Sequence, residues 1–393
     1  MLPGSDLQAI REGIESVDRE LLALLKRRME LVEQVAQTKL KRAFPFRDHE
    51  REERVLRRVR RAALRLGLDP HAVERLYRQI MEMSISHQQR HVRSLATVPL
   101  RVAYQGVEGS YSHLAAQRWY AGREGGALLT GFESCREAAN AVRSAAADVA
   151  LLPIENTTAG SINETYDLLA EGGLRINAEV VSKVEHCLVV QPGVKLDELR
   201  TVISHPQALL QCETYLRSVP WIRPVAEFDT AGAARKVKES NDPSVAAIAS
   251  EKAAVMLGLE VLRKGIQSQA SNATRFVEVA VEAVPCPPDA PCKTSLLVEL
   301  DHSAGKLGEL LMAFGRRHVQ LSKLESRPVP DSPWKYRFYV DVEAHADAVE
   351  MVEALAEIKP LVDSLRVLGT YPRTEKPIDE PIDEPADEQQ AEA

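Results

Sequence analysis

The strongest constraint on how this chain can fold is an apolar stripe over residues 6–40. The stripe follows heptad spacing and predicts one long helix, with Asp6 placed to cap its start. Its members are Leu7, Ile10, Ile14, Val17, Leu21, Leu24, Leu31 and Val35. Such a helix is about 50 Å long, whereas a domain of about 95 residues has a radius of gyration of about 13 Å. The helix would therefore protrude with its stripe exposed, and a helical dimer is the simplest way to bury it.

Two further helices are expected before the pattern changes. Pro45 breaks the chain ahead of a helix at 49–66, which Asp48 can cap, and the "GLDP" turn at 67–70 precedes a third helix at 71–93. One face of this third helix carries Val73, Leu76, Tyr77, Ile80 and Met81. Residues 1–95 are therefore predicted to form an all-α domain.

Polar side chains fall on the apolar faces of all three helices. Arg28 continues the stripe of the first helix, and Lys39 lies only about 20° further round. Ser84 and Gln88 continue the apolar face of the third helix, and Asp48, Arg51 and Glu52 cluster at the start of the second. Because unpaired buried charge is costly, and because arginine binds carboxylates bidentately, we interpret these residues as a pocket for a small, doubly acidic ligand. Arg11 lies about 100° from Arg28 round the helix and could reach only a partner's pocket.

The segments "LQAIREGIESVDRELLALLKRRMELVEQVAQTK", "FPFRDHEREERVL" and "SISHQQ" resemble the small all-helical chorismate mutase family over residues 6–90. The resemblance implies that Arg28, and Arg11 of a second subunit, bind the two carboxylates of chorismate. It also implies that Lys39 and Gln88 bind the ether oxygen, that Asp48 and Glu52 meet the ring hydroxyl, and that Arg51 and Ser84 complete the carboxylate shell. These roles suit a Claisen rearrangement, which needs positioning and electrostatic stabilisation but no proton shuttle.

Residues 100–283 read as α/β, in two lobes. Short β-branched runs at 101–105, 149–152, 176–181, 186–190, 201–203 and 245–248 are expected strands. The run ending at Leu152 is followed by "PIENTTAGSI", which places a carboxylate, an amide and hydroxyls at the end of a buried strand. Open α/β sheets bind ligands beyond the carboxyl ends of their strands, so this loop is a candidate site, although a solvated turn would look the same.

Other features of this region are weak evidence for a binding or catalytic site when each is taken alone. Gly106 and Gly109 lack the third glycine of a nucleotide-binding turn, and His205 reads equally well as a turn residue. Together, however, "YQGVEGSYSHLAAQ", "PIENTTAGSI", "SHPQALLQC" and "SNATRF" resemble prephenate dehydratase. The resemblance implies a two-lobed, binding-protein-like fold with Thr274 donating to the leaving hydroxyl. The cleft would be lined by Ser110, Glu155, Asn156, Thr157 and Arg275, with a structural ion pair as the alternative for Arg275.

After a proline-rich linker at 284–292, residues 293–373 give the order βαββαβ of a ferredoxin-like fold. This unit resembles an ACT regulatory domain. The resemblance implies a phenylalanine site formed by Gly305 and Leu307 with "ESRP", which is Glu325, Ser326, Arg327 and Pro328. Ala304 and Lys306 depart from the family pattern and put the strength of inhibition in doubt. The acidic, repetitive segment 374–393, net −7, is expected to be disordered.

Composition and sequence pattern argue against several classes of protein, including membrane, secreted and metal-binding proteins. No apolar run is long enough to span a membrane, and the first residues lack the apolar core of a secretory signal, so a cytoplasmic protein is expected. The five cysteines show no metal-ligand spacing. Cys286 and Cys292 could be bridged, although free thiols are the expectation for a cytoplasmic protein. No metal or organic cofactor is expected, and neither a membrane nor a nucleic-acid partner.

These features predict a multidomain, bifunctional enzyme of phenylalanine biosynthesis that acts on chorismate and prephenate, with phenylalanine as its effector and a homodimer or larger homo-oligomer as its assembly. The net charge of +6 over residues 1–95 leaves one rival, an amino-acid-sensing regulator that binds nucleic acid. Against it, the cations singled out above face the apolar sides of helices. A second rival is a coiled-coil scaffold whose catalytic half is degenerate.

Overall fold

The computed structural model describes residues 4–42, 49–94, 98–286, 291–300, 303–329, 335–374 and 377–378. Within these ranges it leaves out the side chains at 4–9, 36–37, 39–42, 49–50, 82, 85–86 and 88–94. The chain divides into two compact units. One contains Met1–Leu100 with Ser144–Ala146, and the other contains Arg101–Arg143 and Ala147–Ala393. The expected central and C-terminal domains thus belong to one compact unit.

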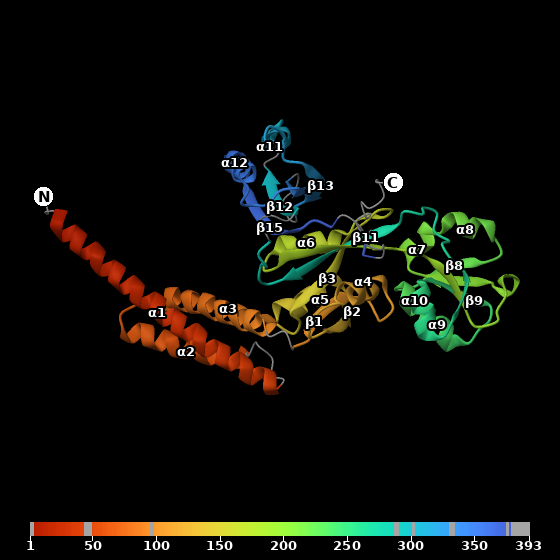
Figure 1. Ribbon diagram of the computed structural model, residues 1–393, viewed down its shortest axis with the longest axis horizontal. Helices are drawn as coiled ribbons and strands as arrows, with labels where there is room; N and C mark the ends of the chain where they lie inside the picture. Colours follow the sequence, from red (N-terminus) through yellow and green to blue (C-terminus); the bar gives the residue numbers. More distant parts are fainter. Residues whose placement is uncertain are drawn as a thin grey trace, which may run out of the picture. The chain divides into compact units, whose positions relative to one another are not determined.

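The first unit is helical, as expected (Figure 1). It consists of α1 (Gly4–Arg42), α2 (His49–Arg65) and α3 (Pro70–Ser94). Helices α1 and α2 both pack against α3. Val32, Leu56, Val59 and Met81 are buried where the helices meet. Leu76, expected on the core face of α3, is instead 53% exposed, because the helix turns the neighbouring Tyr77 and Ile80 inward.

The apolar stripe of α1 is largely uncovered in the single chain. Ile14 is 57% exposed and Leu24 is 62% exposed, and Leu31 is similar. The outward face of α2 is basic. Its exposed arginines are Arg54, Arg57, Arg58, Arg61 and Arg65. The interpretation that the basic residues of this region turn inward therefore holds for Arg28 but not for this face of α2.

The second unit begins with a lobe built on a mixed sheet of order β2-β1-β3-β11-β5, with β4 paired to β3. Its elements are β1 (Leu100–Gln105), α4 (Tyr111–Trp119), β2 (Ala127–Phe132), α5 (Cys135–Arg143), β3 (Val149–Asn156), β4 (Gly160–Ser161), α6 (Asn163–Glu171), β5 (Arg175–Lys183) and β11 (Ala273–Ala280). Strand β3 is buried along almost its whole length, as expected for a strand covered on both faces.

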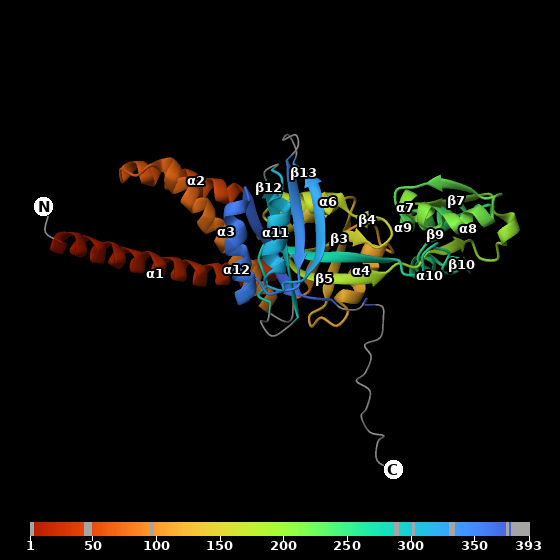
Figure 2. The ribbon, with the colours of Figure 1, turned by 90° about the horizontal axis from the view of Figure 1, so that it is seen from above.

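The chain then crosses to a second lobe with a sheet of order β10-β6-β9-β7-β8. This lobe contains β6 (Cys187–Val190), η1 (Leu196–Glu198), β7 (Thr201–Ser204), α7 (Pro206–Gln211), α8 (Glu213–Ser218), β8 (Arg223–Ala226), α9 (Thr230–Ser240), β9 (Val245–Ala249), α10 (Glu251–Leu257) and β10 (Glu260–Arg263). The chain leaves the first lobe after β5 and returns to it at β11, so two connections join the lobes (Figure 2). The two-lobed α/β fold is confirmed.

The C-terminal part has the expected βαββαβ order. Its elements are β12 (Cys292–Leu300), α11 (Lys306–Gly315), β13 (Leu321–Pro328), β14 (Tyr336–Val342), α12 (Val349–Ile358), η2 (Lys359–Leu361) and β15 (Ser364–Pro372). The antiparallel sheet has order β13-β14-β12-β15. Leu296 and Val298 of β12 pack under α11 and α12, whereas Leu297 joins the core of the first lobe. One face of this sheet therefore packs directly on the first lobe.

The cysteines differ from the free-thiol expectation at one pair. Cys286 and Cys292 form a disulfide, while Cys135, Cys187 and Cys212 are free and buried. The expected disorder of 374–393 falls almost entirely outside the described residues. None of the described helices combines the length and the apolar character needed to cross a membrane.

Candidate active sites

The polar loop after β3 lies where the two connections between the lobes meet. The carboxyl end of β3 contributes Asn156, and the amino end of β11 contributes Thr274, which is its register partner across the two strands. The second lobe contributes Gln211 at the end of α7, and the connection from β5 to β6 contributes His186. Residues far apart in sequence therefore meet at the junction of the lobes.

Asn156 is held by its own loop. Its Oδ1 accepts hydrogen bonds from the backbone N–H groups of Thr158 at 3.0 Å and Ala159 at 2.8 Å, a local arrangement typical of asparagine in turns. This fixes the amide with Nδ2 directed at β11, where it donates to Thr274 Oγ1 at 3.0 Å and to Asn272 Oδ1 at 2.9 Å. The crowding of polar residues after Pro153 therefore orients a side chain rather than forming a simple solvated turn.

Gln211 bridges the lobes. Its Nε2 donates to Asn156 Oδ1 at 3.1 Å and to Thr158 Oγ1 at 2.5 Å. Its Oε1 accepts from Asn272 Nδ2 at 3.0 Å and lies 2.7 Å from His186 Nε2. The only sequence signal for Gln211 was its place in "SHPQALLQC", where His205 draws more attention. In the structure, His205 caps α7, and its Nδ1 accepts from the backbone of Gln207 at 3.1 Å.

His186 extends the network into the first lobe. Burial lowers its pKa from the ordinary value of 6.5, although the hydrogen bond with Gln211 opposes the shift. Because Gln211 Oε1 is an acceptor, His186 Nε2 carries the proton of the neutral ring. Nδ1 lies 2.9 Å from the hydroxyl of Tyr111, which donates its proton to the backbone oxygen of Glu185 at 2.7 Å. Burial raises the pKa of Tyr111 well above its usual value, so this hydroxyl stays protonated.

Thr274 has the arrangement of a hydrogen-bond donor. Its side chain is largely buried, and its Oγ1 accepts from Asn156. Among the residues that the structure describes, no group accepts a hydrogen bond from the Thr274 hydroxyl. Since one lone pair is occupied and the proton is not, this hydroxyl can donate to a ligand.

A cavity of about 140 Å³ adjoins this network. It is lined by Thr158, Gln207, Leu210, Gln211, Gln267, Ser268, Gln269 and Asn272. Asn156 shares hydrogen bonds with the lining residues Thr158 and Asn272, and Thr274 is linked to them through Asn156. The volume is below the roughly 300–1,000 Å³ of most small-molecule sites. A ring-sized ligand would therefore require the lining side chains or the lobes to move apart.

Two of the other expected cleft residues support the local backbone, and two lie on the opposite face of the sheet. Ser110 caps α4 by accepting from the backbone of His113 at 3.3 Å. Thr157 ties the loop to the start of β11, donating to Ser271 O at 3.0 Å and accepting from Ala273 N at 2.9 Å. Glu155 and Arg275 face away from Asn156 and Thr274, toward β13 and β14.

Arg275 therefore forms ion pairs, which was the alternative expectation for this residue, and does not line the cleft. Its Nε lies 2.8 Å from Glu179 Oε2, and its Nη1 lies 2.7 Å from Asp341 Oδ2. The reason is strand geometry. Successive side chains of a strand point to opposite faces, so Thr274 and Arg275 cannot both face the cleft.

In the helical unit, the structure brings together two of the expected residues. Arg28 of α1 is partly buried and donates from Nη1 to the buried Ser84 Oγ of α3. Burial lowers the pKa of Arg28, with a weaker opposing effect from Tyr77. Close by in sequence, His87 Nε2 lies 2.8 Å from Glu33 Oε1. A cation thus points into the helix interface, as the sequence predicts.

The remaining members of this set stay predictions. Arg11 is exposed on α1. Arg51 is exposed and Glu52 is half-buried in the first turn of α2. Asp48 and the side chains of Lys39 and Gln88 lie outside the described residues.

The expected effector segments occupy two elements of the C-terminal sheet domain. Gly305, with a φ of +86°, precedes α11, and Leu307 lies in its first turn. Glu325, Ser326, Arg327 and Pro328 lie on the edge strand β13, where partly buried and exposed residues alternate. Glu325 Oε2 accepts from Ser161 at 2.5 Å, and Arg327 Nη2 donates to Asp167 at 2.8 Å. These two side chains face the first lobe, and Ser326 and Pro328 are exposed.

Comparisons with known proteins cover both sites. Residues 10–89 match the family "Chorismate mutase type II", and residues 102–283 match "Prephenate dehydratase". The bifunctional chorismate mutase/prephenate dehydratase of Escherichia coli strain K12 is 37% identical over 376 residues, which cover 95% of this chain and 97% of that protein.

Two solved structures share the fold of the second unit. Prephenate dehydratase from Arthrobacter aurescens in complex with L-Phe is 30% identical, with a TM-score of 0.64, and the match covers 70% of this chain and 90% of that one. GqqA, described as a novel type of quorum quenching acylase, is 33% identical, with a TM-score of 0.63, over 70% of this chain and 98% of that one. Because the similarity to the Escherichia coli protein extends over nearly the whole of both chains, this protein belongs to the family of bifunctional chorismate mutase/prephenate dehydratases.

Proposed function

We propose that this chain converts chorismate to prephenate in its helical unit and prephenate to phenylpyruvate at the junction of the two lobes. The observation that carries the proposal is the hydroxyl of Thr274, which accepts from Asn156 and keeps its own proton available. Dehydration of prephenate releases CO₂ from the ring carboxylate and expels the C4 hydroxyl, which must gain a proton to leave as water. In this proposal Thr274 supplies a hydrogen bond to that leaving oxygen.

A threonine hydroxyl is a weak acid, so Thr274 acts as a relay or an orienting donor rather than as the source of the proton. Asn156 fixes its rotation by donating to Oγ1 at 3.0 Å. Gln211 in turn fixes Asn156 from the other lobe. Because this network is already formed in the structure, we propose that the lobes separate to admit a substrate and re-form the network around it, which would exclude water.

For the mutase step we propose that Arg28 binds a carboxylate of chorismate. Its guanidinium lies in the helix interface beside Ser84, where burial strengthens its interaction with an anion. Arg11, Lys39, Asp48, Arg51, Glu52 and Gln88 belong to the same proposal. The chemistry needs the two reacting ends held together and the charge on the breaking C–O bond stabilised.

The exposed stripe of α1 supports a homodimer or larger homo-oligomer, in which Arg11 of one protomer completes the pocket of another. The C-terminal sheet domain is proposed to be an ACT domain that senses phenylalanine through Gly305, Leu307 and the segment 325–328. A cytoplasmic location follows from these assignments and belongs to the same proposal.

A two-step assay tests the proposal. The purified full-length chain is given chorismate, and the loss of chorismate, the transient rise of prephenate and the appearance of phenylpyruvate are followed with and without phenylalanine. The proposal expects all three signals and a lower rate of phenylpyruvate formation with phenylalanine. Persistence of chorismate, or prephenate that accumulates without conversion, would remove one of the two activities from this chain.

The regulator alternative is not favoured, because the family match extends through the basic helical region. The arginine face of α2 leaves one simple check on it. Binding of a regulator to DNA would weaken steeply as salt is raised, and the enzyme is expected to show no sequence-specific complex with duplex DNA at physiological salt.

A further inference from the structure

The two strands that carry Asn156 and Thr274 also carry a second pair of residues, one position along. Thr274 is the register partner of Asn156, and Arg275 is the register partner of Glu155. Beyond them the register shifts, because Phe276 pairs with Pro153 and leaves Ile154 as the extra residue of a bulge. Side chains alternate along a strand. The pair Asn156 and Thr274 therefore faces the hydrogen-bond network of Gln211, and the pair Glu155 and Arg275 faces the C-terminal sheet.

Both members of this second pair bind that sheet by ion pairs. Lys323 Nζ of β13 lies 2.7 Å from Glu155 Oε1. Arg275 Nη1 lies 2.7 Å from Asp341 Oδ2 of β14 and 3.7 Å from Glu155 Oε2. Arg275 also contacts Glu179 of β5 through Nε at 2.8 Å. We call these five residues, Glu155, Glu179, Arg275, Lys323 and Asp341, the coupling cluster.

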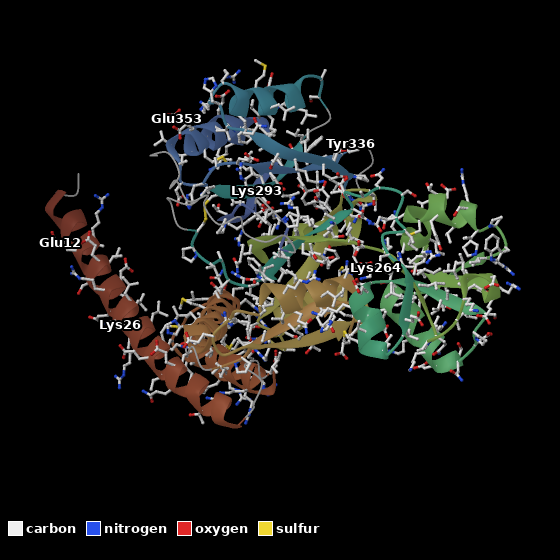
Figure 3. The ribbon with its side chains drawn as sticks, turned by 45° about the vertical axis from the view of Figure 1, so that its right-hand side comes forward. Glu12, Lys26, Lys264, Lys293, Tyr336 and Glu353 are labelled. Carbon is white, nitrogen blue, oxygen red and sulfur yellow. A yellow bond between two sulfur atoms is a disulfide. The ribbon has the colours of Figure 1, made fainter. Side chains whose placement is uncertain are left out.

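The coupling cluster is largely buried, with the side chain of Glu155 its most exposed member at 33%, and it continues into β12 and β15. The Glu179 side chain is 1% exposed, and Lys293 Nζ binds it at 2.8 Å. Lys293 lies between the C-terminal sheet and the first lobe (Figure 3). Arg275 Nη2 donates to the hydroxyl of Tyr371 at 3.0 Å. Burial disfavours the charge on Arg275, but Asp341, Tyr371 and Glu179 outweigh it and raise the pKa of Arg275 well above its usual value.

The strand that binds Glu155 is also the strand that carries the expected effector segment. Lys323, Glu325 and Arg327 alternate along β13 and contact Glu155, Ser161 and Asp167 of the first lobe. Lys323 Nζ also donates to Ser161 Oγ at 3.1 Å. A shift of β13 along its length would therefore displace Glu155 and the short β4, which directly flank Asn156.

The energetics of buried ion pairs suggest that this cluster does more than stabilise the interface between the C-terminal sheet and the first lobe. Buried ion pairs add little stability over apolar packing of the same volume, and their best-attested use is to specify one of two arrangements. Apolar packing is already present at this interface, where Leu297, Tyr339 and Leu368 share the core of the first lobe. Charges placed behind the two catalytic strands are suited to fixing the relative position of those strands and β13.

We propose that the coupling cluster carries the regulatory signal: a ligand on the C-terminal domain moves β13 and β14, and Glu155 and Arg275 pass that movement to Asn156 and Thr274. The proposal rests on the proposed dehydratase activity and on its inhibition by phenylalanine. In this account Glu155, Arg275 and Lys323 are positioning residues. They act through the hydrogen bond between Asn156 and Thr274.

The test replaces Lys323 by methionine in the full-length chain, which keeps the length of the side chain and removes the charge. Prephenate turnover is measured over a range of phenylalanine concentrations, and phenylalanine binding is measured separately by calorimetry. Allosteric coupling is typically about 5–150-fold. We expect wild-type inhibition in this range, inhibition of Lys323→Met below about twofold, and phenylalanine affinity in the variant within about threefold of wild type.

Arg366→Met is the matched control. Arg366 also crosses from the C-terminal sheet to the first lobe, where it donates to the backbone of Ala170, and among the described residues no hydrogen bond or ion pair joins its side chain to β3 or β11. This variant should keep its inhibition. Lys323→Arg retains the ion pair with Glu155 and should restore inhibition, which a loss of packing volume alone would not explain.

Ser161→Ala guards against a misfolded Lys323→Met, because it removes only a hydroxyl that links Lys323 and Glu325 across the interface. Partial loss of inhibition with unchanged phenylalanine binding would support the coupling cluster. Full inhibition in both Lys323→Met and Ser161→Ala would overturn it, as would equal loss of inhibition in Arg366→Met or loss of phenylalanine binding in Lys323→Met. A wild-type enzyme without prephenate turnover or without inhibition would instead contradict the proposed function.

Discussion

The direction of one hydrogen bond decides what Thr274 can do. Asn156 donates to Thr274 Oγ1, so the hydroxyl proton of Thr274 remains free for a ligand. In Asn156→Asp, a carboxylate would take the place of the donor and accept that proton. We expect kcat for prephenate to fall by about 10²–10⁴-fold, the range typical of proton-transfer contributions, with a smaller change in KM. Steady-state kinetics with prephenate check this, and mutase turnover in the same variant is the control.

Retention of kcat in Asn156→Asp would contradict this account of Thr274. The Asn156→Ser variant separates the two effects of the change, since serine keeps a donor and adds no charge. It should lose less activity than Asn156→Asp.

A second residue-scale prediction concerns pH. Burial holds the pKa of His186 below its ordinary value of 6.5, and the neutral ring donates from Nε2 to Gln211. A lowered pKa means that the unfolded chain binds more protons between the two values. The contribution of His186 to stability is therefore complete above pH 6.5 and is lost as the pH falls through the folded-state pKa.

Dehydratase activity should decline over the same acid range, because protonation places a charge in the buried hydrogen-bond network that holds Gln211. Rate profiles between about pH 5 and 8, the window in which histidine charge changes matter, test this. In His186→Asn the acid limb attributable to this ring should be absent and the rate lower. An unchanged limb would assign it to another group.

At this scale the sequence identified Thr274 and Asn156 through a family motif, and the structure places them together. Gln211 and His186 were not singled out, because a lone glutamine or histidine carries no periodic signal and their importance comes from contacts between the lobes. Glu155 and Arg275 were expected in the cleft because their neighbours were. The alternation of side chains along a strand is what puts Glu155 and Arg275 on the opposite face from Asn156 and Thr274.

At the scale of elements, long amphipathic helices and buried strands were predictable. The stripe over 6–40 corresponds to α1, and the runs beginning at 101, 149 and 176 correspond to β1, β3 and β5. The sequence analysis did not list β2, β4, β8, β10 or β11 among its strands. Strands β2, β8 and β10 lie at the edges of their sheets, whereas β11 lies between β3 and β5. An edge strand has one neighbour and one or both faces partly exposed, so its apolar pattern is weak. Leu128 in β2, for example, is 58% exposed.

The contact between β15 and β5 gives an element-scale prediction. A Cβ on Gly369 would collide with the backbone oxygen of Ile176, so only glycine allows the two strands to approach. Gly369→Ala should lower the free energy of unfolding by about 1–3 kcal/mol, the usual cost of overpacking. Denaturant unfolding measures this. Gly308→Ala, in α11 with open space around it, is the control and should be neutral or slightly stabilising.

An unchanged unfolding free energy in Gly369→Ala would mean that β15 can move away from β5 at no cost. The contact would then not be a constraint on how the C-terminal sheet rests on the first lobe.

At the scale of the whole molecule, the exposed stripe of α1 predicts self-association. Ile14 and Leu21 are both more than half exposed, so charge there should not unfold a single chain. The double variant Ile14→Glu/Leu21→Glu should shift the protein toward monomer in sedimentation velocity and lower mutase turnover, since Arg11 would be lost from its partner's pocket. Dehydratase turnover should change less.

Leu22→Glu is the control for that experiment. Leu22 is 67% exposed but lies about 100° round the helix from Leu21, off the stripe. Its assembly should match wild type. A double variant that sediments as wild type would leave the stripe without a function in assembly.

The central claim is that one chain holds two independent active sites for consecutive reactions. The most direct measurement is turnover of chorismate and, separately, of supplied prephenate by wild type, Arg28→Ala and Thr274→Ala. The account predicts that Arg28→Ala loses chorismate turnover and keeps conversion of prephenate, and that Thr274→Ala converts chorismate to prephenate and stops there. Parallel loss of both activities in folded Arg28→Ala, or continued phenylpyruvate formation in Thr274→Ala, would contradict it.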